Sequence, residues 1–310
     1  MPAHRPADDT PPPPITLTPR DAAICLDAHE HRLLDAEIVA WRHFPPAGGV
    51  AHEDRPRVSS AVQRRLALLA DHDFLQRVVR PVLPGTGQAP YAYALGREGA
   101  TLLTRRYGLD PATIAVPARA TGVLHIDHTL GCARAWAALA AACARTADVR
   151  VEHWVGGTAL RAASSSARVQ IRRSGGAAQT LPVIPDGTGV LHHDGGERTA
   201  SARIFLELDR GTETNARVTA KFAAYAAYLR SLGYASTYGE PMALILWVTE
   251  SRQRLTNTLR TIAAVARDEP GLRGRVLGAV LDDLGPGTAL GPIWIVADTG
   301  ERRPLLRRGK

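Results

Sequence analysis

Three carboxylates at the ends of two apolar runs have the arrangement of a cation site. Asp186 follows the first run and opens an expected strand, whereas Glu207 and Asp209 end the second run. The turn signal DGGE lies between the runs at residues 194–197. If a two- or four-residue loop closes this hairpin, opposite positions have an odd sum, so all three side chains project on one side.

Carboxylates that share one face repel one another and raise each other's pKa values unless a cation lies between them. We expect no Arg or Lys beside them on that face. Asp186 and Glu207 are therefore predicted to bind Mg²⁺ or Mn²⁺, which prefer oxygen ligands, and Asp209 is a candidate ligand of a second ion. Lys221 follows on an expected helix. The candidate catalytic residues are Asp186, Glu207, Lys221 and Asp209.

This set of residues resembles the PD-(D/E)xK nuclease motif. The strings FLELDRGTE and KFAAYAAY, at residues 205–213 and 221–228, also resemble the hallmark of the replication-relaxation family of plasmids and integrative elements. The resemblance covers roughly residues 18–298. It implies an α+β protein in which a winged helix-turn-helix precedes a restriction-endonuclease-like α/β core. The chain departs from the nuclease motif at Asp209, where the motif has Lys, so Lys221 would supply the amine from the helix. If Lys221 does not reach the site, the core is a binding platform.

The order of expected elements divides the chain into two domains. Residues 1–17 are a Pro-rich lead expected to be disordered, 18–107 a winged helix-turn-helix DNA-binding domain, 108–122 a linker, and 123–310 the nuclease-like domain. In the first domain, caps and apolar periodicity predict helices over residues 19–30, 36–43, 60–72 and 98–106, with strands over 74–82 and 91–95. In the second, the predicted helices are 124–145, 215–232 and 252–267, and the predicted strands beside the hairpin are 149–155, 242–249 and 292–296. Residues 158–176 are expected to be a loop or a weakly structured segment.

The third expected helix carries polar residues that suit DNA recognition. Ser60, Gln63 and Arg64 lie away from its apolar stripe, and Arg and Gln can bond bidentately to base edges. The candidate phosphate contacts are Arg57, Arg77 and Arg80. The alternative is that all these residues are ordinary solvated positions.

Composition favours an anionic partner. The chain of 310 residues has a net charge of +8, and nucleic acid is the commonest partner of a basic protein. The three cysteines have no metal-ligand spacing and are interpreted as buried apolar residues in a reducing cytosol. There is no signal-peptide pattern and no apolar run long enough to span a membrane, so a cytoplasmic protein, nucleoid- or plasmid-associated, is expected.

Histidine and tyrosine pairs offer weaker alternatives. His125 and His128 lie one turn apart on a helix and could bind metal, but no third ligand is evident, so a structural role is favoured. The role of Glu152 is left open. Tyr225 and Tyr228 could suggest nicking by a tyrosine nucleophile, but core packing or contact with a groove is favoured.

Together with its resemblance to the replication-relaxation family, the sequence predicts a DNA-binding and DNA-processing protein of a mobile element, acting in plasmid replication, relaxation or mobilisation. The leading hypothesis is a Mg²⁺-dependent DNA nuclease or nickase with double-stranded DNA as its partner. The alternative is a non-catalytic accessory factor or transcription regulator with a degenerate nuclease-like domain. Other relaxation or replication proteins of the same element are candidate partners.

Overall fold

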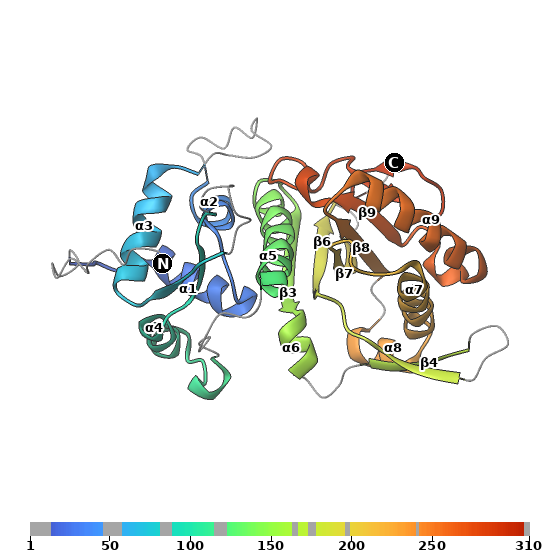
Figure 1. The fold of residues 1–310 in the computed structure, drawn as a ribbon, viewed down its shortest axis with the longest axis horizontal. Coiled ribbons are helices and arrows are strands. Elements are labelled where there is room, and N and C mark those ends of the chain that lie inside the picture. Colours follow the sequence, from blue (N-terminus) through green and yellow to red (C-terminus); the bar gives the residue numbers. More distant parts are fainter. Residues whose placement is uncertain are drawn as a thin grey trace, which may run out of the picture. The chain divides into compact units, whose positions relative to one another are not determined.

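The computed structural model describes residues 14–45, 58–80, 89–114, 123–162, 167–172, 178–195, 199–239 and 242–306 (Figure 1). The chain forms two compact units, and the division falls between Ile126 and Asp127, inside one helix. Each unit is described by itself. The linker expected over residues 108–122 lies partly outside the described residues, so the domain boundaries stay a prediction.

The first unit consists mainly of helices that begin at polar caps. Its elements are α1 (Pro19–His31), α2 (Ala36–His43), α3 (Ser60–Asp71), β1 (Leu75–Val78), β2 (Ala92–Leu95), α4 (Arg97–Tyr107) and the 3₁₀ turn η1 (Pro111–Thr113). The side chain of Asp35 accepts a hydrogen bond from the Ile38 amide, and that of Ser59 accepts one from Val62. These bonds satisfy amides that a helix start leaves unpaired. The helices predicted from the caps are thus confirmed to within a residue or two at each end.

A small sheet closes the first unit. Strands β1 and β2 pair antiparallel, with Leu75 opposite Leu95. Leu34, between α1 and α2, forms an isolated antiparallel bridge with Tyr93 of β2. Strand β1 ends at Val78, before the predicted end at residue 82, and β2 begins one residue later than predicted and is buried throughout.

The second unit is built on a seven-stranded sheet. Its helices are α5 (Val123–Ala144), α6 (Gly157–Ala162), α7 (Asn215–Leu229), α8 (Leu232–Tyr238) and α9 (Arg252–Asp268), with 3₁₀ turns η2 (Pro270–Leu272) and η3 (Leu281–Asp283). Its strands are β3 (Val149–Gly156), β4 (Ala167–Arg172), β5 (Ala178–Val183), β6 (Gly187–Asp194), β7 (Thr199–Asp209), β8 (Met242–Thr249), β9 (Val276–Val280), β10 (Trp294–Val296) and β11 (Arg302–Arg303). The large sheet has the order β11-β10-β9-β8-β7-β6-β3, and β4 and β5 form a separate antiparallel pair. The fold is therefore mixed α+β, as expected.

Strand direction in the large sheet changes at its centre. Strands β3, β6 and β7 form an antiparallel meander, whereas β7, β8 and β9 run parallel. Residues 243–249 of strand β8 are all buried, as expected for a parallel strand covered on both faces. The register of β6 and β7 places Gly187 opposite Leu206, so opposite positions have an odd sum and the predicted pairing of the hairpin is confirmed.

Helices cover both faces of this sheet (Figure 1). On one face, Trp247 of β8 contacts Phe222 of α7 and donates a hydrogen bond to Thr258 of α9. On the other face, α5 approaches so closely that a Cβ at Gly131 would lie 2.5 Å from a methyl group of Leu208. The end of β7 therefore lies between helices of two layers.

A bulge in β3 explains Gly187, the residue after Asp186. The register of β3 shifts between Glu152 and Val155, and the ring of Trp154 stacks on Trp136 of α5 with centroids 4.4 Å apart. A Cβ at Gly187 would lie only 2.1 Å from Trp154 Cζ2. Only glycine fits at position 187, because any side chain there would collide with Trp154.

Several expected elements are corrected by the structure. The segment predicted to be a loop contains α6 and β4, because β4 pairs with β5 and contacts α7 although its own sequence is weakly apolar. The helix predicted to reach residue 232 ends at Leu229, and Ser231 caps the separate helix α8. Strands β5, β9 and β11 were not predicted; β9 is a short buried run. Among the described residues, no helix is both long and apolar enough to cross a membrane.

Candidate active site

Asp186 lies at the end of the sheet where β6 begins and β7 ends. Its Oδ2 accepts a hydrogen bond from the backbone amide of Leu208 at 2.9 Å, and its Oδ1 lies 3.1 Å from Nε2 of His128 on α5. Burial favours the neutral acid, but these partners outweigh it and keep the pKa of Asp186 below its usual value. Asp186 is therefore a carboxylate at neutral pH, fixed between the sheet and α5.

Glu207 is fully enclosed on the α7 side of the sheet, with 3% of its surface exposed. Its Oε2 accepts a hydrogen bond from Nζ of Lys221 at 2.8 Å, and its Oε1 accepts one from the Tyr225 hydroxyl at 2.5 Å. Burial raises its pKa, and the nearby charge of Asp186 adds to that rise, while Lys221 opposes it. Asp186 and Glu207 thus influence each other's charge, but helices on opposite faces of the sheet hold the two acids that were expected to share one face: α5 binds Asp186 and α7 binds Glu207.

Lys221 connects two acids from different segments. Its Nζ also donates to Oε1 of Glu213 at 2.7 Å, and it lies 5.4 Å from the ring centroid of Trp247. The two carboxylates raise the pKa of Lys221, although its burial opposes this. The amine reaches the site from α7 because Lys221 and Tyr225, one turn apart, both face the end of β7.

Asp209 is occupied by other partners. Its Oδ1 accepts a hydrogen bond from the amide of Gly211, and its Oδ2 accepts one at 2.6 Å from Nε of Arg254 on α9. The expectation of three carboxylates without basic neighbours is therefore wrong. Lys221 and Arg254, distant in the sequence, supply positive charge to this face. The expected rise in pKa holds for Glu207 but not for Asp186, whose hydrogen bonds favour the carboxylate.

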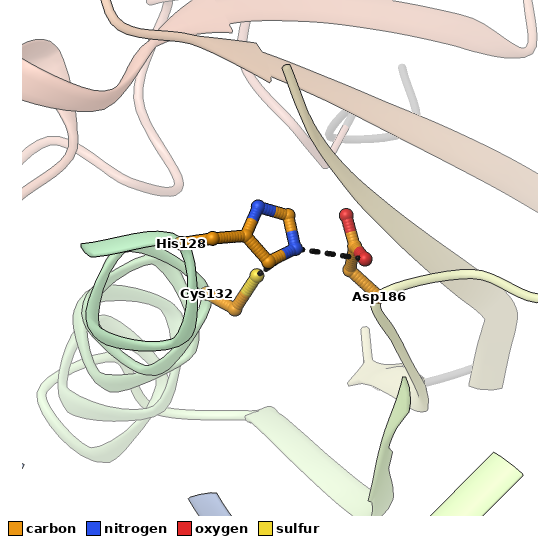
Figure 2. A group of neighbouring side chains, drawn as sticks. All are labelled: His128, Cys132 and Asp186. Carbon is orange, nitrogen blue, oxygen red and sulfur yellow. Dashed lines mark hydrogen bonds and ion pairs between the residues drawn. The ribbon is translucent and has the colours of Figure 1, made fainter. Parts of the chain in front are cut away.

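His128, for which a structural role was favoured, and Cys132, which was interpreted as a buried apolar residue, both lie at the site (Figure 2). Both project from α5 toward Asp186, and the Cys132 sulfur lies 3.7 Å from Nε2 of His128. The hydrogen bond to Asp186 raises the pKa of His128. Their spacing of four residues, which puts two side chains on one helix face, was the available signal. The pair weighed in the sequence, His125 and His128, has a spacing of three residues.

The tyrosines of α7 do not have the exposure of a nucleophile. Tyr225 is 1% exposed and its hydroxyl donates a hydrogen bond to Glu207, and Tyr228 is buried beside Tyr234. The favoured interpretation as core packing is thus consistent with the structure. Glu152 of β3 accepts a hydrogen bond from Arg150 at the edge of the sheet.

The residues expected to contact DNA lie in the first unit. Ser60, Gln63 and Arg64 are exposed on α3, opposite its buried side chains Val62, Leu66 and Leu69. Arg77 of β1 is exposed but forms an ion pair with Asp71 at 2.7 Å. Arg80 is partly buried, and Arg57 lies outside the described residues.

Comparison with known protein families gives one match. Residues 27–240, more than half of the chain, match the family described as replication-relaxation. The matched range begins in α1 and ends after α8, so it includes Asp186, Glu207 and Lys221. No curated protein and no solved structure matches the chain. On the family match, the protein belongs to the replication-relaxation family.

Proposed function

We propose that the protein binds duplex DNA through its first unit and cuts or nicks DNA with its second unit, in the replication, relaxation or mobilisation of a plasmid or other mobile element. The family membership supports the biological setting. The cytoplasm, at the nucleoid or plasmid, would be its place of action. Other proteins of the same element are candidate partners.

The element order of the first unit supports a winged helix-turn-helix. Three helices precede a two-stranded hairpin. Leu34, in the segment between α1 and α2, pairs with Tyr93 of the hairpin as a single antiparallel bridge. In such domains the third helix enters the major groove. Exposed Gln63 and Arg64 on α3 have the side chains that read base edges, and Ser60 lies beside them near the helix start.

The element order of the second unit supports a nuclease-like core. Helix α5 is followed by the meander β3-β6-β7, then by α7, and then by β8 parallel to β7. One observation carries the nuclease proposal. The Lys221 ammonium, supplied by α7, lies 2.8 Å from Glu207 and acts electrostatically on Asp186. An acid on each strand of the hairpin and one amine are the groups that a PD-(D/E)xK site needs.

The donor set also fits a hard divalent cation. Each of the four carboxylate oxygens of Asp186 and Glu207 accepts one hydrogen bond, and a carboxylate offers about four lone-pair sites in all. Asp186 and Glu207 would therefore hold Mg²⁺ or Mn²⁺. Such an ion supplies a bound water of lowered pKa and offsets charge on the phosphate. In this proposal Lys221 stabilises negative charge developing on the phosphate, and the Tyr225 hydroxyl orients Glu207.

A second candidate function is favoured by Asp209 and Arg254. Asp209 stands at the position where the nuclease motif has Lys, and Arg254 neutralises it. Every acid of the site already has a donor or cation from the protein. A non-catalytic accessory factor that binds DNA and recruits a partner, or a transcription regulator, is therefore the alternative.

Supercoiled plasmid DNA separates the two functions. If the protein is a nuclease, the wild type should nick or linearise the plasmid with Mg²⁺ or Mn²⁺, and Asp186→Ala should lose the activity. Lys221→Met should lower it at least ~10²-fold, the typical loss for one charge-stabilising group. Asp268→Asn, at an exposed acid on α9, is the matched control. If wild type leaves supercoiled, linear and branched DNA intact with both metals while binding DNA, the protein is the accessory factor.

A further inference from the structure

A second set of metal-binding atoms lies beside the carboxylate pair. The ligand atoms of His128, Cys132 and Asp186 all lie within 4.8 Å of one another. In Figure 2, Nε2 of His128 and the Cys132 sulfur project from α5, and the carboxylate of Asp186 faces them from the start of β6. Two of the three groups come from one helix face and the third from the sheet, so the fold brings the trio together.

The two separations from His128 match those of a tetrahedral site. Typical Zn²⁺ bonds of ~2.0–2.3 Å at tetrahedral angles put a nitrogen and a sulfur ligand about 3.5 Å apart, and a nitrogen and an oxygen ligand about 3.3 Å apart. In the structure these separations are 3.7 Å for His128 and Cys132, and 3.1 Å for His128 and Asp186. Side-chain shifts of a few tenths of an ångström would admit an ion at the centre.

The donor types select the metal. One imidazole nitrogen, one sulfur and one carboxylate oxygen suit a borderline ion such as Zn²⁺, whereas Mg²⁺ takes oxygen ligands. The hydrogen bond from the Leu208 amide fixes Oδ2 of Asp186 and leaves Oδ1 directed at the trio. Partners of this kind orient ligands in known metal sites.

A second trio, in the first unit, does not have these properties. The ligand atoms of Asp27, Glu30 and His31 also all lie within 4.8 Å of one another. The carboxylate of Asp27 is bound by Arg42 and His43, so its charge is already neutralised. That trio also has no sulfur donor.

We infer that His128, Cys132 and Asp186 form a binding site for a zinc-like divalent ion, with a fourth coordination position open to water or a phosphate oxygen. The site shares Asp186 with the proposed Mg²⁺ site but uses neither Glu207 nor Lys221, and its sulfur and nitrogen ligands belong to it alone. Metal binding by Cys132 and His128 can therefore be measured separately from DNA cleavage, and this inference goes beyond the proposed nuclease activity.

Cobalt provides the test, because Co²⁺ bound to a thiolate has a sulfur-to-metal charge-transfer absorption in the near ultraviolet. The full-length protein, stripped of metal with a chelator and kept reduced, is titrated with CoCl₂. We expect the charge-transfer band to saturate at one equivalent, together with the visible bands of tetrahedral Co²⁺. Zn²⁺ should abolish the spectrum, and a large excess of Mg²⁺ should leave it unchanged.

Variants assign the band to this site. Cys132→Ser should lose the charge-transfer band, and His128→Asn should weaken Co²⁺ affinity at least ~10-fold, the loss that even outer-shell changes cause. Cys143→Ser, on the same helix but outside the trio, is the matched control, and Glu30→Gln controls for the other trio. If Cys132→Ser does not fold by circular dichroism, Cys132→Ala replaces it. A wild type without the band, or a band that survives replacement of Cys132, would overturn the inference whatever the outcome of the cleavage assay.

Discussion

The ammonium of Lys221 lies 2.8 Å from Oε2 of Glu207, and the side chains of this ion pair are 29% and 4% exposed. Removing one member of a buried pair leaves the other charge uncompensated. We expect Lys221→Met to lower the free energy of unfolding by about 3 kcal/mol at neutral pH, as measured by urea denaturation. Since Glu207 can then take up a proton, the loss should be smaller at pH 5 than at pH 8.

Two variants check this explanation. Arg217→Met, at an exposed position one turn earlier on α7, should change stability by less than ~0.5 kcal/mol. Adding Glu207→Gln to Lys221→Met should restore part of the lost stability, because the neutral amide needs no counter-charge. Additive losses in the double variant would contradict the pairing.

His31 should make the first unit sensitive to acid. Burial lowers the pKa of His31 from 6.5 to about 4. The unfolded chain therefore binds a proton at higher pH than the folded one, and stability is lost as pH falls from about 6.5 toward 4. This group should cost the unit about 2 kcal/mol between pH 7 and pH 5. Urea unfolding of wild type and His31→Gln at both pH values measures the difference, and equal pH dependence in the two proteins would refute it.

Gly187→Ala tests the close approach of Trp154 to β6. The added Cβ would lie 2.1 Å from Cζ2 of Trp154 and push the indole off its stack on Trp136. We expect a loss of about 2 kcal/mol, in the range of overpacked cores, and a change in tryptophan fluorescence. Gly271→Ala is the control, because nothing lies within 4 Å of its Cβ position. Similar stability of the two variants would mean that Trp154 is not held against Gly187.

Arg64 should contribute to DNA affinity without contributing to the fold. Its side chain is exposed on α3, whereas the neighbouring Arg65 is bound to Asp21. Arg64→Ala should cost roughly 1–3 kcal/mol on a cognate duplex, and binding by the wild type should weaken steeply with salt. Fluorescence anisotropy measures both effects, and Arg267→Ala, an exposed arginine of the second unit, is the control. A salt-insensitive signal, or equal losses in the two variants, would count against α3 as the DNA contact.

Local signals in the sequence were sufficient for much of the fold. Caps at Asp35 and Ser59 and the apolar stripe of α3 predicted helices whose bounds the structure reproduces closely. Such signals depend on residues a few positions apart. Strands β4 and β5 gave no comparable signal, because they are stabilised by pairing with each other and by contact with α7.

The sequence alone determined the hairpin register and named Lys221 as the candidate amine, but only the structure shows Lys221 reaching Glu207. Alternation along two strands follows from neighbouring residues, so the register needed no knowledge of the packing. Only the tertiary structure decided which groups neutralise the carboxylates. Arg254 reaches Asp209 from α9, and His128 and Cys132 reach Asp186 from α5, across 45 and up to 58 residues of sequence. Those contacts depend on which helices cover each face and end of the sheet, and the packing of whole layers, not local periodicity, fixes that choice.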